Sequence, residues 1–64
     1  MAGIHRKVTT LPGLDQMMLG KGITYETLAN AAGLNKSTVW RAKRGKQILV
    51  GTARLILETL NTRF

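Results

Sequence analysis

Hydrophobic residues recur at helical spacing in four stretches of the chain. In the first stretch, Leu11, Leu14 and Met18 follow the i, i+3, i+7 spacing of one buried helical face. Pro12 suits an early helical turn, and we expect this helix to end near Leu19. The Gly-Lys-Gly segment that follows contains residues that tolerate positive φ, so the chain should turn there.

The second stretch carries signals for both ends of a helix. Thr24 can cap a helix that begins at Tyr25. The hydrophobic residues Ile23 and Leu28 flank this cap at the spacing of a hydrophobic staple. Gly33 falls where a left-handed residue ends a helix and redirects the chain. The inner face of this helix is expected to contain Leu28, Ala29 and Ala32.

A third helix should follow directly after this turn. Leu34 is expected to fill the corner, and Asn35 is a good N-cap. The inward positions of the helix, Val39 and Ala42, are small enough to let it cross the second helix closely. We expect the helix to stop at Gly45.

A fourth helix is predicted from about Thr52 to near Asn61, where it covers the core. Its inner positions are expected to be Ala53, Ile56, Leu57 and Leu60. Residues 1–10 have no clear period and form either a basic arm or one short edge strand. The sequence therefore predicts an all-α fold, with a basic N-terminal arm over residues 1–10 and one compact domain over residues 11–64.

The composition is that of one small domain. A chain of 64 residues can hold a single core, and chains of this size rarely gain more than about 3 to 5 kcal/mol from it. The absence of Cys excludes disulfides and thiolate metal sites, and it fits an intracellular location, which we expect to be cytoplasmic. All apolar runs fall far short of the roughly 18 residues that a bilayer span requires, so we expect a soluble protein.

The charge imbalance indicates a polyanionic partner. Ten Lys and Arg against three acids give a formal charge of +7. Many of the cations lie close together near the third helix, namely Lys36, Arg41, Lys43, Arg44 and Lys46. A membrane surface would require a large apolar helix face with Trp or Phe opposite such cations. Nucleic acid is therefore the favoured partner, and no membrane contact is expected.

Two short helices joined by a tight turn with a glycine form a helix-turn-helix, whose second helix lies in the major groove of DNA. The spacing of Ala29, Gly33 and Val39 fits such a unit. The stretch LANAAGLNKSTVWRAKRGK at residues 28–46 resembles the second helix, turn, recognition helix and Gly-Lys exit of the Cro and phage-repressor (XRE-type) family. The resemblance covers roughly residues 11–61 and implies a compact four-helix, lambda-repressor-like domain.

The resemblance also implies which residues contact DNA, through a recognition helix over residues 35–44. The candidates for base reading on its outward surface are Lys36, Ser37, Thr38, Trp40, Arg41 and Arg44, with Asn35 at its start also expected to bind DNA. Arg41 can donate paired hydrogen bonds to guanine O6 and N7, and Thr38 offers a methyl group to thymine. Phosphate contacts are expected from Thr24, Tyr25, Lys43 and Lys46.

Three groups of residues have alternative interpretations. Trp40 either contacts DNA or packs at the edge of the core. Four hydrophobic residues exceed what one small core can hold, namely Ile48, Leu49, Val50 and Leu55. They form either a homodimer interface, which we favour, or local packing beneath the N-terminal segment. The basic residues Arg6 and Lys7 either reach DNA as an arm or form a tail.

An enzyme is the weakest functional class, because the sequence offers no nucleophile with an adjacent base, no paired carboxylates and no metal-ligand spacing. No cofactor and no small-molecule ligand are expected. The favoured function is a transcriptional regulator that binds double-stranded DNA, acting as a small repressor of phage or mobile-element type. It would bind a palindromic operator as a homodimer.

Two alternative functions stay open. Residues 33–41 are also similar to the DNA-binding tail of resolvases and invertases, which would indicate a recombination or excision accessory protein. A protein-interaction module, such as an antitoxin or an anti-repressor, would use the same fold to bind a protein partner.

Overall fold

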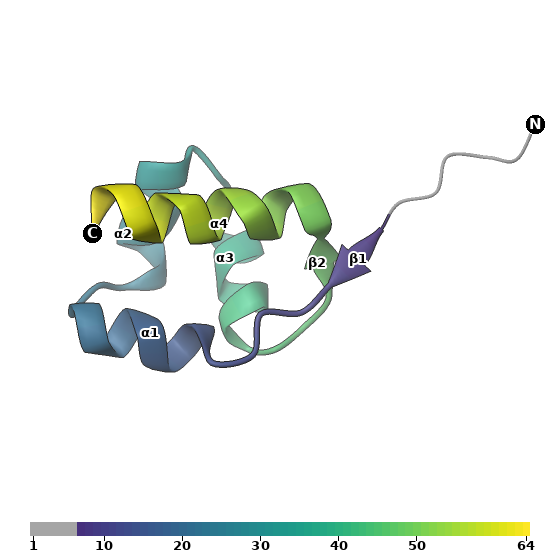
Figure 1. The fold of residues 1–64 in the computed structure, drawn as a ribbon, viewed down its shortest axis with the longest axis horizontal. Helices are drawn as coiled ribbons and strands as arrows, with labels where there is room; N and C mark the ends of the chain where they lie inside the picture. Colours follow the sequence, from purple (N-terminus) through teal and green to yellow (C-terminus); the bar gives the residue numbers. More distant parts are fainter. Residues whose placement is uncertain (1–6) are drawn as a thin grey trace, which may run out of the picture.

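The computed structural model describes residues 7–64 (Figure 1). The elements in chain order are β1 (Val8–Thr9), α1 (Leu14–Lys21), α2 (Tyr25–Ala32), α3 (Lys36–Lys43), β2 (Ile48–Leu49) and α4 (Val50–Arg63). The predictions for residues 1–6, including the role of Arg6 in a basic arm, lie outside the described residues. Residues 7–64 form a compact, mostly helical domain of four helices with a small two-stranded sheet.

The four helices surround one hydrophobic core. α2 packs against both α3 and α4, while α1 and α4 lie on opposite sides of the molecule in Figure 1. Every helix and strand β2 contribute to the core, whose members are Leu11, Leu14, Met18, Leu28, Ala29, Val39, Ala42, Ile48, Ala53, Ile56 and Leu60. The inner faces predicted for the first three helices are confirmed, except that Ala32 is only half-buried.

The turn between α2 and α3 depends on a glycine. Gly33 has φ 69°, in the left-handed region that an L side chain rarely adopts. Beyond it, the amide of Leu34 donates to the carbonyl of Ala29 at 2.9 Å, which satisfies a carbonyl at the end of the helix. The predicted stop at Gly33 is confirmed, and the sharp turn allows α3 to pack against α2.

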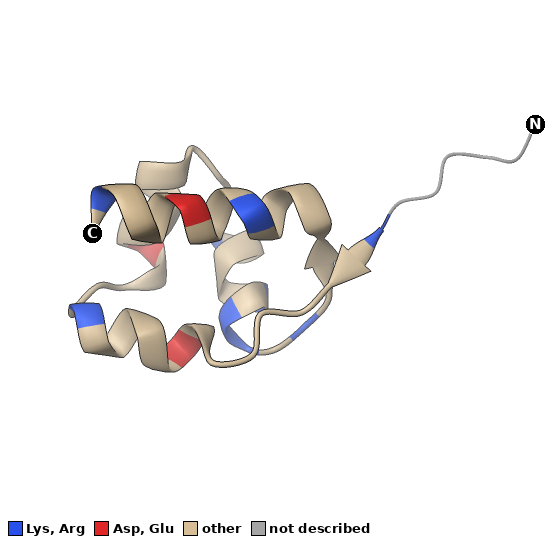
Figure 2. Cartoon of the chain, viewed as in Figure 1, with Lys and Arg blue, Asp and Glu red and all other residues tan. Residues whose placement is uncertain are grey.

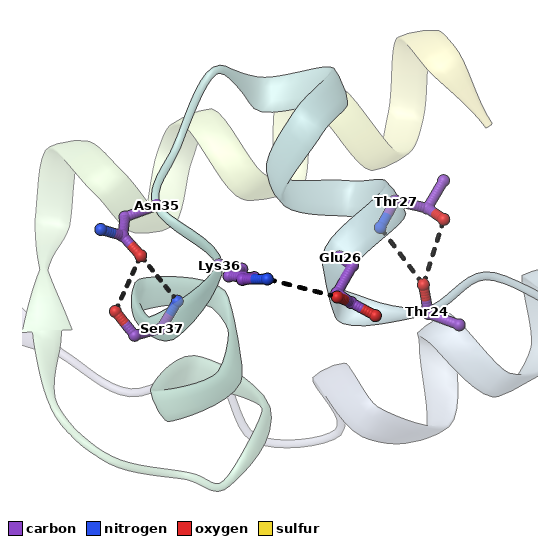
Figure 3. A network of polar contacts seen from close by, with 6 residues as sticks. All are labelled: Thr24, Glu26, Thr27, Asn35, Lys36 and Ser37. Atoms are coloured by element: carbon purple, nitrogen blue, oxygen red, sulfur yellow. Dashed lines mark hydrogen bonds and ion pairs between the residues drawn. The ribbon is translucent and has the colours of Figure 1, made fainter.

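Side-chain caps begin both of these helices, as the sequence predicted. The Thr24 hydroxyl accepts a hydrogen bond from the Thr27 amide at 3.2 Å, and the Asn35 side chain accepts one from the Ser37 amide at 3.0 Å (Figure 3). Each cap satisfies an amide that has no partner within its own helix. The starts of α2 and α3 are therefore defined by residues next to them in the chain.

The bounds predicted for the first helix were wrong at both ends. Pro12 lies in a turn before the helix rather than in its first turn, and Gly13 at φ 82° occupies the N-cap position of α1. The helix continues through Gly20 to Lys21, beyond the predicted end near Leu19. It ends at Gly22, which has φ 68° and turns the chain as Gly33 does after α2.

A strand was missed between α3 and α4, where the sequence predicted no helix or strand. β1 and β2 pair antiparallel, with Val8 opposite Leu49 and Thr9 opposite Ile48. Of the two interpretations of the N-terminal segment, the short strand is therefore found, at Val8–Thr9. Residue 48 was also placed wrongly on an exposed dimer surface, because the Ile48 side chain is 7% exposed and belongs to the core.

The fourth helix begins earlier than predicted, and its inner face is confirmed at Ala53, Ile56 and Leu60 but not at Leu57. α4 starts at Val50 rather than near Thr52, and runs to Arg63. Leu57 is 41% exposed, whereas Thr59 is buried at 5% exposure, so the expectation for Leu57 was wrong. Positions 57 and 59 flank the central line of the inner face on opposite sides, and the neighbouring elements cover only the side of Thr59. Among residues 7–64, no helix combines the length and apolar character that crossing a bilayer would need.

Candidate nucleic-acid interface

Helix α3 buries only one side. Val39 and Ala42 have no exposed area, because they face the core. The exposed residues of α3 and of its C-cap are Lys36, Ser37, Trp40, Arg41 and Arg44, while Thr38 and Lys43 are half-buried. The spacing of the exposed residues, at i, i+1, i+4, i+5 and i+8, places them along one side of the helix. We call these five residues the α3 face.

The cap at the start of α3 determines what two of the predicted contact residues can do. The Asn35 Oδ1 atom accepts hydrogen bonds from the Ser37 amide at 3.0 Å and from the Ser37 hydroxyl at 2.8 Å (Figure 3). The Asn35 side chain therefore serves the helix start, as an N-cap does. The hydroxyl oxygen of Ser37 keeps its lone pairs and can still accept a hydrogen bond from a base or a water.

Acidic side chains partly neutralise the lysines of α3. The Lys36 Nζ atom lies 3.5 Å from Glu26 Oε2 (Figure 3), and the Lys43 Nζ atom lies 3.4 Å from Asp15 Oδ1. All four side chains are at least one-third exposed, and exposed ion pairs contribute little to stability. Their effect is to lower the charge that these two lysines offer to a ligand.

The arginines near the end of α3 carry no such partner. Within residues 7–64, neither Arg41 nor Arg44 forms an ion pair with a carboxylate, and the same holds for Lys46 in the loop after α3. In Figure 2, blue segments that mark Lys and Arg lie at the end of α3 and in the loop that follows it. An anion that approaches this part of the α3 face meets positive charge that is not already paired.

The sole tryptophan lies on the α3 face and outside the core. Trp40 is 39% exposed, and it is not a member of the core cluster. The Arg44 Cζ atom lies over its ring, 5.1 Å from the ring centroid. Trp40 also lines a shallow hollow together with Tyr25, Lys36 and Ser37. An aromatic surface of this kind is accessible to a binding partner.

The start of α2 is less suited to phosphate than the sequence predicted. The Thr24 hydroxyl is occupied in capping α2, and Tyr25 is half-buried against the core. Glu26 lies in the first turn, where its carboxylate occupies the positive end of the helix dipole. The first turn of α3 holds no acid, but the Ser37 amide donates to Asn35 Oδ1 and the Thr38 amide donates to the Asn35 carbonyl. Neither helix start therefore offers a phosphate a full set of free amides.

A second hollow brings one residue to the α3 face that the sequence analysis missed. Thr38 and Arg41 line it from α3, and Gln47 lines it from the loop after α3. The strand residues Val8 and Leu49 also line it. A glutamine amide can pair with the N6 and N7 atoms of adenine, as arginine does with guanine. The position of Gln47 three residues after Arg44 was the only sign in the sequence that it could join the DNA contacts. The path of the loop brings Gln47 into the same hollow as Arg41.

Three of the four predicted dimer residues lie together on the surface. Leu49, Val50 and Leu55 line one hollow, which also includes Lys7. Leu49 is 43% exposed and Leu55 is 38% exposed, while Val50 is half-buried. We call Leu49, Val50 and Leu55 the apolar patch. It adjoins the hollow at Arg41, since Leu49 lines both.

Comparisons with protein-family models, with curated proteins and with solved structures find no match to this chain.

Proposed function

We propose that this chain is a sequence-specific protein that binds double-stranded DNA through a helix-turn-helix. In this proposal α2, the turn at Gly33 and α3 form the motif, and α3 enters the major groove as the recognition helix. The observation that carries the proposal is the α3 face, on the side of the helix that does not face the core. It lines up hydrogen-bonding side chains with arginines that form no ion pair with a carboxylate of residues 7–64. A formal charge of +7 supports it.

The proposed contacts divide into base reading and phosphate binding. Arg41 reads guanine, Thr38 contacts a thymine methyl group, and Gln47 reads adenine from the same hollow. Lys46 binds a backbone phosphate, and contacts of this kind position the helix without specifying sequence. Lys36 and Lys43 contribute more weakly, because Glu26 and Asp15 already lie within ion-pair distance of them.

The proposed biological role is that of a small repressor of phage or mobile-element type. The resemblance of residues 28–46 to the Cro and phage-repressor family supports this role. A homodimer would place two copies of α3 on the two halves of a palindromic operator, because the symmetry of the protein and that of the site match. Binding over a promoter would block access of RNA polymerase.

Salt dependence is the first test of DNA binding. If about six phosphates are neutralised, log K should fall with log salt at a slope near −5, and affinity should drop about 1,000-fold between 50 and 200 mM salt. Binding is measured by fluorescence anisotropy with labelled fragments from the genomic neighbourhood of the gene, in excess competitor DNA. Absence of any preferred fragment would contradict the proposal and favour a protein-interaction module.

Footprinting separates the repressor from the recombination accessory protein. One palindromic footprint over a promoter is the expected result. Several direct repeats beside a recombination junction would keep the DNA-binding function but replace the regulatory role.

Self-association is expected to depend on the apolar patch. Leu55→Glu places a charge among Leu49 and Val50, and we expect it to shift the mass in solution from about twice the chain mass of 7.0 kDa to the chain mass itself. Sedimentation equilibrium or light scattering measures this mass. The patch is small, so we expect the dimer to be weak in the absence of DNA and the measurement to need a concentration series.

Leu57→Glu is the matched control for this change. Leu57 lies on α4 with an exposure of 41%, close to the 38% of Leu55, but about 200° away around the helix. If Leu57→Glu abolished self-association and Leu55→Glu did not, the interface would lie on the other side of α4. If the wild type bound its DNA site as a single chain of 7.0 kDa, that result would contradict the dimer altogether.

A further inference from the structure

Trp40 and Arg44 form a cation–π pair on the α3 face. They are four residues apart, which places their side chains one above the other on the helix surface. The Arg44 Cζ atom lies over the Trp40 ring at 5.1 Å from its centroid. The backbone amide of Arg44 also donates to the Trp40 carbonyl at 3.0 Å, so both the main chain and the side chain of Arg44 are tied to Trp40.

This cation–π contact restricts the guanidinium without using its hydrogen bonds. The attraction to the ring comes from the charge of the guanidinium, so the contact consumes none of its five N–H donors. No carboxylate among residues 7–64 forms an ion pair with Arg44. The donors of Arg44 are therefore available to an external acceptor, and the side chain loses less conformational freedom when it binds one.

The position of the pair favours a phosphate over a base as that acceptor. Recognition helices read base edges with their N-terminal residues, and here Ser37, Thr38 and Arg41 occupy the earlier turns. Arg44 is the C-cap of α3, at the opposite end. Bidentate N–H donation from arginine matches two oxygens of one phosphate.

We propose that Trp40 is a positioning residue that holds the Arg44 guanidinium ready for a backbone phosphate at the carboxyl end of α3. The inference rests on the DNA-binding function proposed above and moves Arg44 from base reading to phosphate binding. Trp40 acts through Arg44, and the indole itself makes no contact with a base.

A double-mutant cycle tests the coupling, with Trp40→Leu, Arg44→Ala and both together in the full chain. Trp40→Leu should weaken binding to the preferred duplex about two- to fivefold, which is the range expected for an exposed cation–π contact. It should have no effect in the Arg44→Ala background. Trp40→Phe, which keeps a ring, should retain most of the coupling. Circular dichroism confirms that each variant is folded.

Salt titration distinguishes the loss of the Arg44 charge from the loss of its positioning by Trp40. Arg44→Ala should make the salt slope shallower by about 0.9, the value expected for one phosphate contact. Trp40→Leu should leave the slope unchanged, because the charge is still present. Lys46→Ala is the matched control: it should change the slope by the same amount as Arg44→Ala, yet show no coupling to Trp40. A neutral methylphosphonate at the contacted phosphate should weaken the wild type but not Arg44→Ala.

Tryptophan fluorescence reports on the contact between Trp40 and Arg44 in the absence of DNA. Trp40 is the only Trp of the chain, so its emission should change in Arg44→Ala and stay unchanged in Lys46→Ala. If Trp40→Leu lowered the affinity for DNA equally in the wild type and in Arg44→Ala, the inference would be overturned, since the indole would then contact DNA directly. That result leaves the DNA-binding function intact, whereas a wild type that binds no duplex overturns both.

Discussion

Replacing Arg41 with alanine is expected to weaken binding to the preferred DNA site about ten- to a hundredfold. A bidentate pair of arginine with guanine contributes about 1 to 3 kcal/mol of discrimination against other bases. Arg41 is exposed on the α3 face, it lines a hollow with Thr38 and Gln47, and no carboxylate among residues 7–64 forms an ion pair with it. Affinity for random-sequence duplex should fall much less, because that binding depends on phosphate contacts.

The measurement is a competition titration in which specific and random duplexes are compared for each variant. Arg54→Ala is the matched control, because it removes the same charge from an exposed position on α4, outside the α3 face. Arg54→Ala should change both affinities alike and only slightly. If Arg41→Ala bound the specific site as tightly as the wild type does, α3 would not be the recognition helix and a protein-interaction module would be favoured.

Replacing Leu28 with alanine is expected to unfold most of the chain at 37 °C. The Leu28 side chain has no exposed area, and it comes from α2, the helix that packs against both α3 and α4. Leucine-to-alanine changes in a core cost about 2 to 5 kcal/mol. Because a core of this size rarely supplies more than about 3 to 5 kcal/mol, one such change removes most of the stability.

Thermal and urea unfolding followed by circular dichroism measure this effect. Leu19→Ala is the matched control: it makes the same chemical change on α1, where the side chain is 80% exposed, and it should alter stability by less than about 0.5 kcal/mol. If the two variants were equally stable, the packing of α2 described here would be wrong. DNA added at saturating concentration should partly restore the fold of Leu28→Ala, because a ligand of the native state stabilises it.

Short-range signals predicted most of the helical framework. The caps at Thr24 and Asn35 and the stop at Gly33 act on amides or carbonyls within a few residues, so they can be recognised in the sequence. The buried pair Val39 and Ala42 follows from the helical period alone. The same period predicted the exposed members of the α3 face, whereas Thr38, also expected on the outward surface, is half-buried.

Features that join distant segments were not predictable from the sequence. Strand Ile48–Leu49 exists because Val8–Thr9 lies beside it, and two residues are too few to show a strand period. The same pairing accompanies the burial of Ile48, which removes it from the surface. Gln47 reaches the hollow at Arg41 only through the path of the loop that leads into this strand.

The amino-acid sequence by itself determined that four helices form, the caps at Thr24 and Asn35 and the outward side of α3, because each depends on interactions within about one helical turn. Tertiary structure alone decided which flank of α4 is buried, which lysines face a carboxylate and where the strands pair. Those choices depend on how the helices are placed against one another. The free-energy differences between alternative placements arise from contacts between residues far apart in the chain, and no local pattern encodes them.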